Sequence, residues 1–352
     1  MKKSFLADID QEIAELFPGY FSLVMATGIV SIAAHFFLFN LIAEILLYIN
    51  LVAYFVLWLL YIVRLVRHSG RMVEDFKNAG LSAGFFTIVA GTCVLGSQMI
   101  ILKDWYQVAY PLFFLGMGLW IFLIYLFFLT MITRESKPSL ENGINGSWFI
   151  AIVGTQSISV LGSLIAPLFS QHQDILLFFT LFMYLVGGML YLLLVTLVFY
   201  RLLFNPLMAQ AMSPTYWISM GAIAITTLAG GRLMINAPLW PILSSLLPFL
   251  HGLTLFFWAF ATWLIPLLVI LGFWRHIIKK VPIQYEPHYW GMVFPLGMYT
   301  VSTFILSKAM HLDFLEIIPQ YFFYIALGAW LATMSGLVIQ LWNLLWPSQT
   351  KR

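Results

Sequence analysis

Residues 84–98 read GFFTIVAGTCVLGSQ, and the following apolar segment, at residues 111–129, reads PLFFLGMGLWIFLIYLFFL. The first segment is laced with Gly, Ser and Thr, whereas the second consists mostly of Leu, Phe, Ile and Tyr. In lipid, small residues let helices approach closely, and bulky apolar residues suit the surface that faces the acyl chains. The two segments together predict a helical hairpin with one helix inside a bundle and one outside.

The same alternation runs along the whole chain. Gly, Ser and Thr make up about a third of the odd-numbered apolar segments and about an eighth of the even-numbered ones. A helix needs about 20 apolar residues to cross the roughly 30 Å of hydrocarbon. Ten segments are long enough, at residues 18–39, 41–63, 81–102, 106–131, 147–168, 174–200, 214–233, 243–272, 289–307 and 319–346. The sequence therefore predicts an all-α integral membrane protein, with ten transmembrane helices forming five hairpins in a pseudo-fivefold ring around a central pore.

The composition excludes an ordinary soluble protein, because 62% of the residues are hydrophobic, 9% are charged and the mean hydropathy is +0.95. The polar N-terminal residues lack the apolar core of a cleavable signal peptide. We expect a cytoplasmic segment at residues 1–17, a single transmembrane domain at 18–346 and a cytoplasmic tail at 347–352. Cys93 is the only cysteine, so no disulfide and no cysteine-based metal or redox site is expected, and nothing indicates a cofactor.

The positive charges are unevenly distributed. The N-terminal segment, the loops between hairpins and the C-terminus carry 14 of the 17 Lys and Arg residues. The positive-inside rule then places both termini in the cytoplasm, with the protein in the plasma membrane, or in the inner membrane if the source is a bacterium. The net charge of +3 reflects this asymmetry and gives no reason to expect a nucleic-acid partner.

Glycines recur at a regular distance and support the hairpin interpretation. Gly28, Gly91 and Gly154 are spaced by about 63 residues, each near the middle of an odd segment, and Gly221 and Gly297 follow. An even number of helices per repeat keeps successive repeats in one orientation. The symmetry axis would then lie along the membrane normal, as in parallel-repeat transporters.

Several segments resemble one known family in the same order along the chain. They are FPGYFSLVMATGIVSIA (17–33), GFFTIVAGTCVLGSQ (84–98), NGSWFIAIVGTQSISVLGS (145–163), YWISMGAIAITTLAGG (216–231) and YWGMVFPLGMY (289–299). The chain resembles the tellurite-resistance/dicarboxylate transporters, which include plant slow-type anion channels, fungal malate permeases and sulfite efflux pumps. The resemblance implies ten helices in five hairpins, a pore formed by the odd helices, a homotrimer in the lipid bilayer and permeation of small anions. It also implies a gate, because Phe294-Pro295 matches a pore-blocking phenylalanine beside a helix-kinking proline.

The residues themselves also allow a gate at Phe294. A proline within a helix removes one backbone hydrogen bond and bends the chain, so Pro295 would expose backbone groups in the middle of a span. Irregular backbone is tolerated at this depth only beside protein or a water-filled cavity. The Phe294 ring could then close the path by dewetting. The alternative is that Phe294, one of 32 phenylalanines, merely packs against its neighbours.

Hydroxyl groups and the backbone beside glycines can solvate an anion without a fixed charge. Residues of this kind in the odd segments are the predicted pore lining: Thr27, Gly28, Gly91, Thr92, Gly154, Thr155, Thr226, Gly297 and Thr300. A weak, distributed site lets the ion leave again, as conduction requires. The alternative for each hydroxyl is a bond to the carbonyl one turn back.

Few ionisable residues lie within the segments. Arg232 and Lys308, on odd segments near the outer face, could attract anions, or they could extend to the lipid headgroups. Four arginines at the inner mouth would either form a positively charged vestibule or serve only as ordinary topology signals: Arg64, Arg67, Arg201 and Arg275. Three histidines could relay protons: His35, His251 and His288. No Asp or Glu lies mid-span in the odd segments, so cation coupling through a buried acid is not expected.

These features predict an anion channel or uniporter for malate-type C4-dicarboxylates, sulfite, halides or related oxyanions. An enzyme is not expected, because the chain has no HExxH motif, no phosphate-binding GxxxxGK[ST] motif and no obvious nucleophile–histidine–acid set. Two alternatives stay open. One is a proton-coupled dicarboxylate, sulfite or tellurite carrier on the same fold that uses histidine. The other is a membrane-embedded enzyme or scaffold with a closed core, which anion flux from pure protein would dismiss.

Overall fold

The computed structural model describes residues 2–169 and 171–345, and every regular element within them is a helix. Nine of these helices are long and apolar enough to cross a membrane. A tenth, α2 (Ser22–Phe36), is apolar but shorter, and it occupies the middle of the predicted span 18–39. The predicted tail at 347–352 lies outside the described residues.

Within the described residues, five helices form the interior of the bundle. These inner helices are α2, α5 (Phe86–Lys103), α8 (Ile150–Ile165), α10 (Ile218–Asn236) and α13 (Trp290–Met310). They coincide with the odd-numbered apolar segments. In the last four, 89–94% of the most apolar window is buried, and in α2 every residue from Ser22 to Ala34 is buried. Each of the last four follows a short 3-10 helix: η1 (Ser82–Phe85), η2 (Gly146–Phe149), η5 (Pro214–Trp217) or η8 (Pro287–Tyr289).

Five longer helices surround them. These peripheral helices are α3 (Asn40–Arg67), α6 (Tyr106–Thr133), α9 (Gln173–Phe204), α12 (Leu247–Phe273) and α14 (Ile317–Leu345). Only 22–44% of their most apolar windows is buried, so much of their Leu, Phe and Ile surface faces outward, as lipid requires. The remaining elements are short and lie at the two ends of the bundle: α1 (Lys2–Ala14), α4 (Ser69–Lys77), α7 (Leu140–Gly143), α11 (Pro241–Ser245), η3 (Ala166–Leu168), η4 (Ala209–Ala211), η6 (Ala237–Leu239), the π-helix η7 (Trp274–Ile278) and η9 (Asp313–Glu316).

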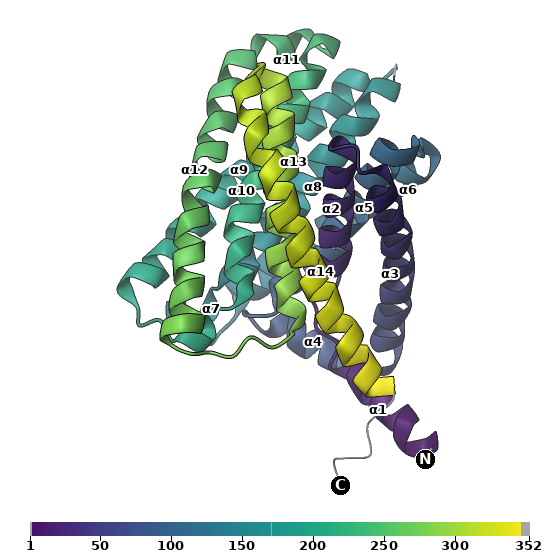
Figure 1. Cartoon of the computed structure of the whole chain (residues 1–352), viewed down its shortest axis with the longest axis vertical. Helices are drawn as coiled ribbons and strands as arrows, with labels where there is room; N and C mark the ends of the chain where they lie inside the picture. Colours follow the sequence, from purple (N-terminus) through teal and green to yellow (C-terminus); the bar gives the residue numbers. More distant parts are fainter. Residues whose placement is uncertain (1, 170, 346–352) are drawn as a thin grey trace.

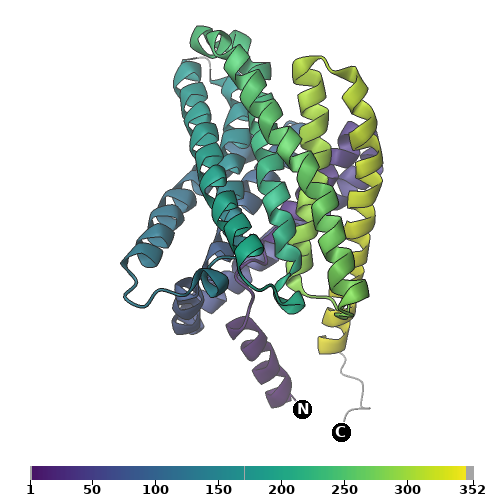
Figure 2. The same ribbon diagram turned by 90° about the vertical axis from the view of Figure 1, so that its left-hand side faces the viewer.

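The inner helices contact one another in a closed circuit. Helix α2 packs against α5, α5 against α8, α8 against α10, α10 against α13, and α13 returns to α2. Each inner helix also packs against the peripheral helix that follows it in the chain, so every pair is an antiparallel hairpin. Figures 1 and 2 show the result, a bundle in which α3 and α14, far apart in sequence, lie on either side of α2.

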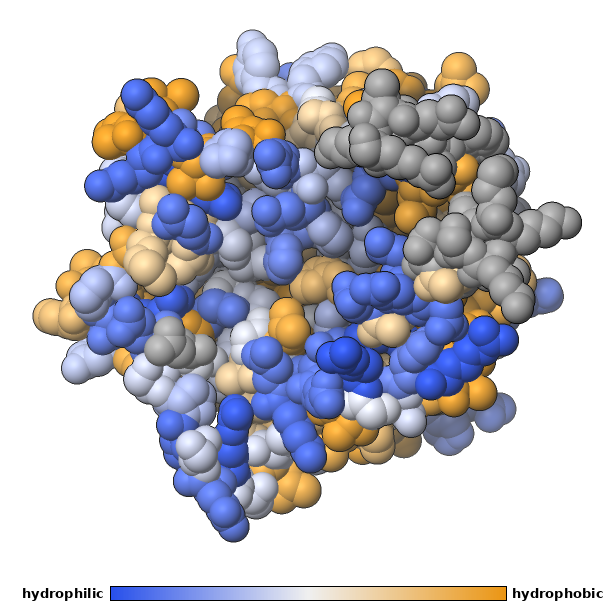
Figure 3. Space-filling view, turned by 90° about the horizontal axis from the view of Figure 1, so that it is seen from below, coloured by the Kyte–Doolittle hydropathy of each residue, from blue (hydrophilic) through white to orange (hydrophobic). Residues whose placement is uncertain are grey.

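The two ends of the bundle differ in their connections. At one end the chain reverses tightly after α2, α5 and α13, where Leu38, Asp104 and His311 adopt the left-handed backbone conformation. The other end holds α1, α4, α7 and the last turn of α14 (Figure 1). We call these the turn end and the terminal end. Polar side chains gather over the terminal end, which Figure 3 views from below.

Candidate functional site: a cavity between the inner helices

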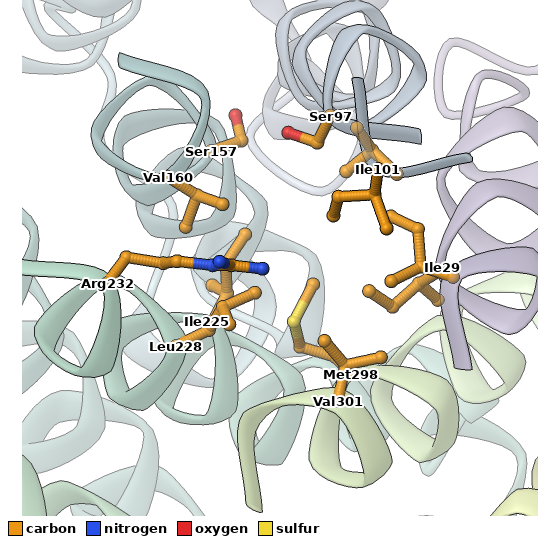
Figure 4. Close-up of a pocket in the computed structure, with 12 residues that line it drawn as sticks. Ile29, Ser97, Ile101, Ser157, Val160, Ile225, Leu228, Arg232, Met298 and Val301 are labelled. Carbon is orange, nitrogen blue, oxygen red and sulfur yellow. The ribbon is translucent and has the colours of Figure 1, made fainter. Parts of the chain in front are cut away.

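A cavity lies between the inner helices, in the half of the bundle nearer the turn end. All five helices contribute to its wall, which Figure 4 shows: Ile29 and Ile32 from α2, Val94, Ser97 and Ile101 from α5, Ser157 and Val160 from α8, Ile225, Leu228 and Arg232 from α10, and Met298 and Val301 from α13. The cavity is small, because the volume open to the centre of a water molecule inside it is about 20 Å³. About 10–15 Å³ measured in this way is enough for one water molecule.

The wall is aliphatic except for three side chains. Ser97 and Ser157 face each other across one side of the cavity in Figure 4. The Ser97 hydroxyl donates to the carbonyl of Cys93 at 2.9 Å, and the Ser157 hydroxyl donates to that of Gly154 at 2.8 Å. Both hydroxyls are therefore bonded one turn back along their own helices, with their oxygen atoms at the cavity.

The third polar side chain is Arg232, on the last turns of α10. Its guanidinium group extends into the cavity toward Met298 and the α2 side (Figure 4). Its Nε atom is buried without a hydrogen-bond partner, and no ion pair joins Arg232 to any residue within 2–169 or 171–345. The residue as a whole is half-buried, so its charge lies at the cavity without a partner among the described residues.

Three of the threonines predicted to line the pore contact peripheral helices in this structure. Trp330 Nε1 donates to the Thr27 hydroxyl at 3.0 Å, and Trp120 Nε1 donates to the Thr155 hydroxyl at 2.8 Å. The hydroxyls of Tyr54 and Thr92 lie 3.0 Å apart. Tyr54 and Trp120 belong to the peripheral helix of the preceding hairpin, whereas Trp330 belongs to the last helix, α14, which closes the circuit onto α2. A fourth bond, from Trp258 Nε1 to Thr303, follows the same pattern between α12 and α13 at 3.0 Å.

Four of the five predicted threonines also bond one turn back along their own helices. Thr92 donates to the carbonyl of Ile88 at 2.7 Å, and Thr155 donates to that of Ala151 at 2.8 Å. The Thr226 hydroxyl donates to the carbonyl of Ala222 at 2.8 Å, and that of Thr300 donates to Leu296 at 2.9 Å. None of the five predicted threonines is among the cavity-wall residues described above. The wall comes instead from other positions on the same helices.

The predicted glycines lie where neighbouring inner helices approach. A Cβ atom on Gly28 would lie 2.8 Å from Val94 of α5, and one on Gly297 would lie 2.8 Å from Ile29 of α2. A Cβ atom on Gly91 would lie 3.3 Å from the carbonyl oxygen of Phe21, and one on Gly154 would lie 3.6 Å from Phe86. These glycines set the spacing of the helices around the cavity, because three of the four leave no room for a Cβ without a shift of the neighbour.

Phe294 lies one turn before the cavity wall on α13. Its side chain is 1% exposed, and it shares a helical face with Met298 and Val301, four and seven residues further on. Pro295 lies within the helix, which continues to Met310, and Gly221 of α10 packs against the proline ring. Phe294 thus lies buried between the cavity wall and the terminal end.

The predicted proton-relay residues lie away from the cavity wall. His288 packs on the ring of Phe17, with the ring centroids 4.3 Å apart, and its Nδ1 is 3.8 Å from a carboxylate oxygen of Glu286. His35 and His251 are half-buried, and neither lines the cavity. Within the described parts of the chain, no three His, Cys, Asp or Glu side chains gather closely enough to hold a metal ion.

The remaining basic residues have protein partners or lie at the bundle ends. Lys308 pairs with Glu316 beyond the turn end of α13. Arg64 is buried, donates to the carbonyl of Ala14 at 3.0 Å and pairs with Asp75. Arg201 donates to the hydroxyl of Tyr216. These three side chains differ from Arg232 because each has an acceptor within the protein.

An apolar bundle with one unpaired cation in an internal cavity is typical of a multi-pass membrane transport protein. The sequence model of the voltage-dependent anion channel family matches residues 15–338. The chain belongs to this family, which confirms the resemblance to the tellurite-resistance/dicarboxylate transporters.

Relatives from two organisms match the chain. An uncharacterized transporter of Methanocaldococcus jannaschii is 28% identical over 326 residues, which cover 90% of this chain and 92% of that protein. A second uncharacterized transporter of the same organism is 26% identical over 333 residues, 92% of each chain. An uncharacterized membrane protein of Mycobacterium tuberculosis is 41% identical over 145 residues, 41% of this chain and 72% of its own length.

Proposed function

We propose that this protein is an anion channel or uniporter whose pore runs through the circuit of inner helices. The observation that carries the proposal is Arg232, a cation without a protein partner in a cavity that all five inner helices line. A fixed positive charge in a narrow passage attracts anions and repels cations. The permeant ions would be small anions such as halides, sulfite or malate-type C4-dicarboxylates, in line with the family.

The architecture that we infer is ten membrane-crossing helices in five hairpins, arranged with pseudo-fivefold symmetry. Support comes from the closed order of contacts among the inner helices and from the repeated aromatic–threonine bonds. Helix α2 would be the tenth span, extended at its start by the turns at residues 18–21. We also propose a plasma-membrane location with both termini in the cytoplasm, because the basic residues gather at the terminal end, and a homotrimer, as the family resemblance implies.

Phe294 is the gate in this proposal, with Pro295 shaping the helix beside it. The ring is buried on the face of α13 that also carries Met298 and Val301 of the cavity wall. An apolar ring in a narrow passage excludes water and with it the ions that need water. Rotation of the ring or bending at Pro295 would open the passage.

Flux measurements with purified protein in liposomes test the proposal. Liposomes loaded with potassium salts of chloride, nitrate, sulfite or malate are diluted into an impermeant salt, with and without the potassium carrier valinomycin. We expect anion efflux that needs valinomycin, because a uniporter moves net charge. Efflux without valinomycin, accompanied by internal pH change, would instead favour the proton-coupled carrier. No flux of any anion beyond protein-free liposomes would refute both.

A further inference from the structure

We propose that the terminal end carries a binding site for the headgroup of an anionic phospholipid. The site is the pocket between α4 and the segment that follows α6, and its two cations are Lys77 and Arg134. This lipid site is separate from the cavity between the inner helices, and it does not depend on the proposed anion flux.

An arginine lies within three residues of the end of each of four peripheral helices. They are Arg64 of α3, Arg134 after α6, Arg201 of α9 and Arg275 after α12. Arg64, Arg201 and Arg275 are only 1–8% exposed, so their charged side chains lie within the protein. Arg134 differs, because it is exposed and has no hydrogen-bond or ion-pair partner among the described residues. A partner for Arg134 must therefore come from outside this part of the chain.

Arg134 shares the pocket with a second cation. The wall consists of Glu74, Lys77, Asn78, Ala79, Arg134 and Pro138. Lys77 is exposed and has no ion-pair partner within residues 2–169 and 171–345, whereas Glu74 pairs with Arg71 at 3.5 Å. The volume open to the centre of a water molecule is about 380 Å³, far above the roughly 10–15 Å³ that one water molecule needs. The pocket thus has a net positive charge and room for a whole headgroup.

The wall on the α4 side is held in place by the bundle. Met72 and Phe76, on one face of α4, pack against the core, and the ring centroids of Phe76 and Phe85 lie 5.5 Å apart. Just after this helix, Trp148 Nε1 donates to the carbonyl of Ala79 at 2.8 Å. The pocket is therefore formed before a ligand binds, which lowers the entropic cost of binding.

The pocket lies at the depth of the lipid headgroups. Helix α6 has 28 residues and is therefore about 42 Å long, which matches the roughly 40–45 Å of a bilayer with its headgroup layers. Arg134, directly after α6, then lies in a headgroup layer. Leu129 and Ile132, near the end of the same helix, are 59% and 68% exposed and would contact the acyl chains of the same lipid. A free phosphate ion would make no contact with this apolar surface.

The charge of the pocket selects an anionic lipid. The proposed topology places the terminal end at the cytoplasmic leaflet, whose anionic lipids are bound by basic pockets of membrane proteins. A guanidinium group offers paired N–H donors to a phosphate, and an ammonium group adds a compact charge. Phosphatidylcholine carries the same phosphate and also a quaternary ammonium group, which the two cations would repel. We therefore expect phosphatidylglycerol to bind more tightly than phosphatidylcholine.

Native mass spectrometry of the full-length protein counts the lipids that stay bound when either lipid is added to the detergent micelles. The wild type should hold one phosphatidylglycerol molecule more tightly than phosphatidylcholine. Lys77→Gln and Arg134→Gln should each weaken phosphatidylglycerol binding about fivefold, and the double variant about thirtyfold. The matched control is Lys280→Gln, which should bind as the wild type does. Lys280 is an exposed cation beyond α12, outside the pocket and without an ion-pair partner among the described residues.

Glu74→Gln separates the site from a general loss of folding. Without this carboxylate the two cations are unopposed, so phosphatidylglycerol binding should tighten roughly threefold, which a damaged protein would not show. If the double variant fails to fold, Glu74→Gln and the single variants carry the test. Unchanged phosphatidylglycerol binding in all three would overturn the site, and so would equal affinity of the wild type for the two lipids.

Two further outcomes separate this proposal from its neighbours. The unfolding temperature should rise with phosphatidylglycerol and not with millimolar inorganic phosphate, because a ligand stabilises the folded state that binds it. An equal rise with inorganic phosphate, lost in Arg134→Gln, would show a soluble ligand and overturn the lipid assignment. Absence of anion flux in liposomes would remove the proposed function, while one tightly bound phosphatidylglycerol in the same protein would keep the lipid site.

Discussion

The inner and peripheral helices are both strongly apolar, yet four of the inner helices are 89–94% buried along their most apolar windows and the peripheral helices only 22–44%. The difference between them lies in side-chain size and hydroxyl content. The peripheral helices present Leu, Phe and Ile outward, whereas the inner helices approach through glycines and bond through threonines. In a soluble protein the interior is the more hydrophobic region. In this bundle the interior is the region where side-chain size and shape are most constrained. The lipid-facing surface is less constrained, because lipid accepts any bulky apolar side chain.

The largest effect should come from bulk added between helices. Gly230 of α10 faces α12 so closely that a Cβ atom would lie 2.1 Å from Thr254 Oγ1 and 2.8 Å from its Cγ2. Overpacking of a fitted interior costs typically about 1–3 kcal/mol and sometimes more. We expect Gly230→Leu to lower the free energy of unfolding by more than about 3 kcal/mol. The variant should also fail to assemble, which the loss of a monodisperse species in detergent would show. Gly252→Leu is the control on α12, because nothing lies within 4 Å of its Cβ position. If both variants assembled equally well, the inner helices would be no more sensitive to added bulk than the peripheral helices.

Truncation of Phe294 should change function more than stability. If the ring closes the passage, Phe294→Ala should raise anion flux about tenfold, which corresponds to a barrier lower by about 1.4 kcal/mol. Truncation of a phenylalanine that only packs would instead cost roughly 3–5 kcal/mol of stability and give no gain in flux. The control is Phe256→Ala on α12, where the side chain is 53% exposed. Flux in Phe294→Ala at or below the wild-type level, with normal expression, would remove this residue from the gate.

Loss of one bond between an inner and a peripheral helix should have a moderate effect. Trp120→Phe or Thr155→Val removes the 2.8 Å bond between α6 and α8. Hydrogen bonds between membrane helices contribute about 0.6 kcal/mol on average and up to about 1.7 kcal/mol. Each variant should lower the unfolding free energy by about 1 kcal/mol, and the double variant should cost less than their sum. Strict additivity in this double-mutant cycle would show that the two side chains do not interact. Trp263→Phe, at an exposed site on α12, is the control.

The smallest effect is expected on the lipid face. Leu59 of α3 is 48% exposed, so Leu59→Phe should change the unfolding free energy by less than about 0.5 kcal/mol. Leu194, on the peripheral helix α9, is only 6% exposed and faces the bundle, so Leu194→Phe should cost about 1–3 kcal/mol. Thermal unfolding in detergent compares the two. If both substitutions were neutral, burial on the inward side of a peripheral helix would carry no constraint.

The alternation of small and bulky segments was enough to predict which helices are buried. Composition is averaged over a whole helix, so single irregular residues do not alter the assignment. The first boundary was less accurate, since the predicted span 18–39 contains a helix at Ser22–Phe36 that follows a series of turns around Pro18 and Gly19. Hydropathy averaged over an apolar segment changes little when a few turn residues are included, so the average does not show where the helix begins.

The rotation of each inner helix could not be predicted in the same way. A helix buried on all sides shows no polar face, so hydropathy does not tell which residues meet the cavity and which meet another helix. Thr27 has its partner at Trp330, 303 residues away, and no local pattern reveals such a pair. Arg232 was recognisable as a charge on an odd segment. Its direction, inward or toward the headgroups, depends on how α10 packs against its neighbours.

The bond from Trp330 to Thr27 joins the last helix of the chain to the first inner one. During synthesis, α2 is made long before α13 and α14, so one flank of the first hairpin has no partner until translation reaches the last hairpin. The circuit consequently closes only at the final hairpin. A chain that is cut short before α13 leaves α2 without the two helices that cover it.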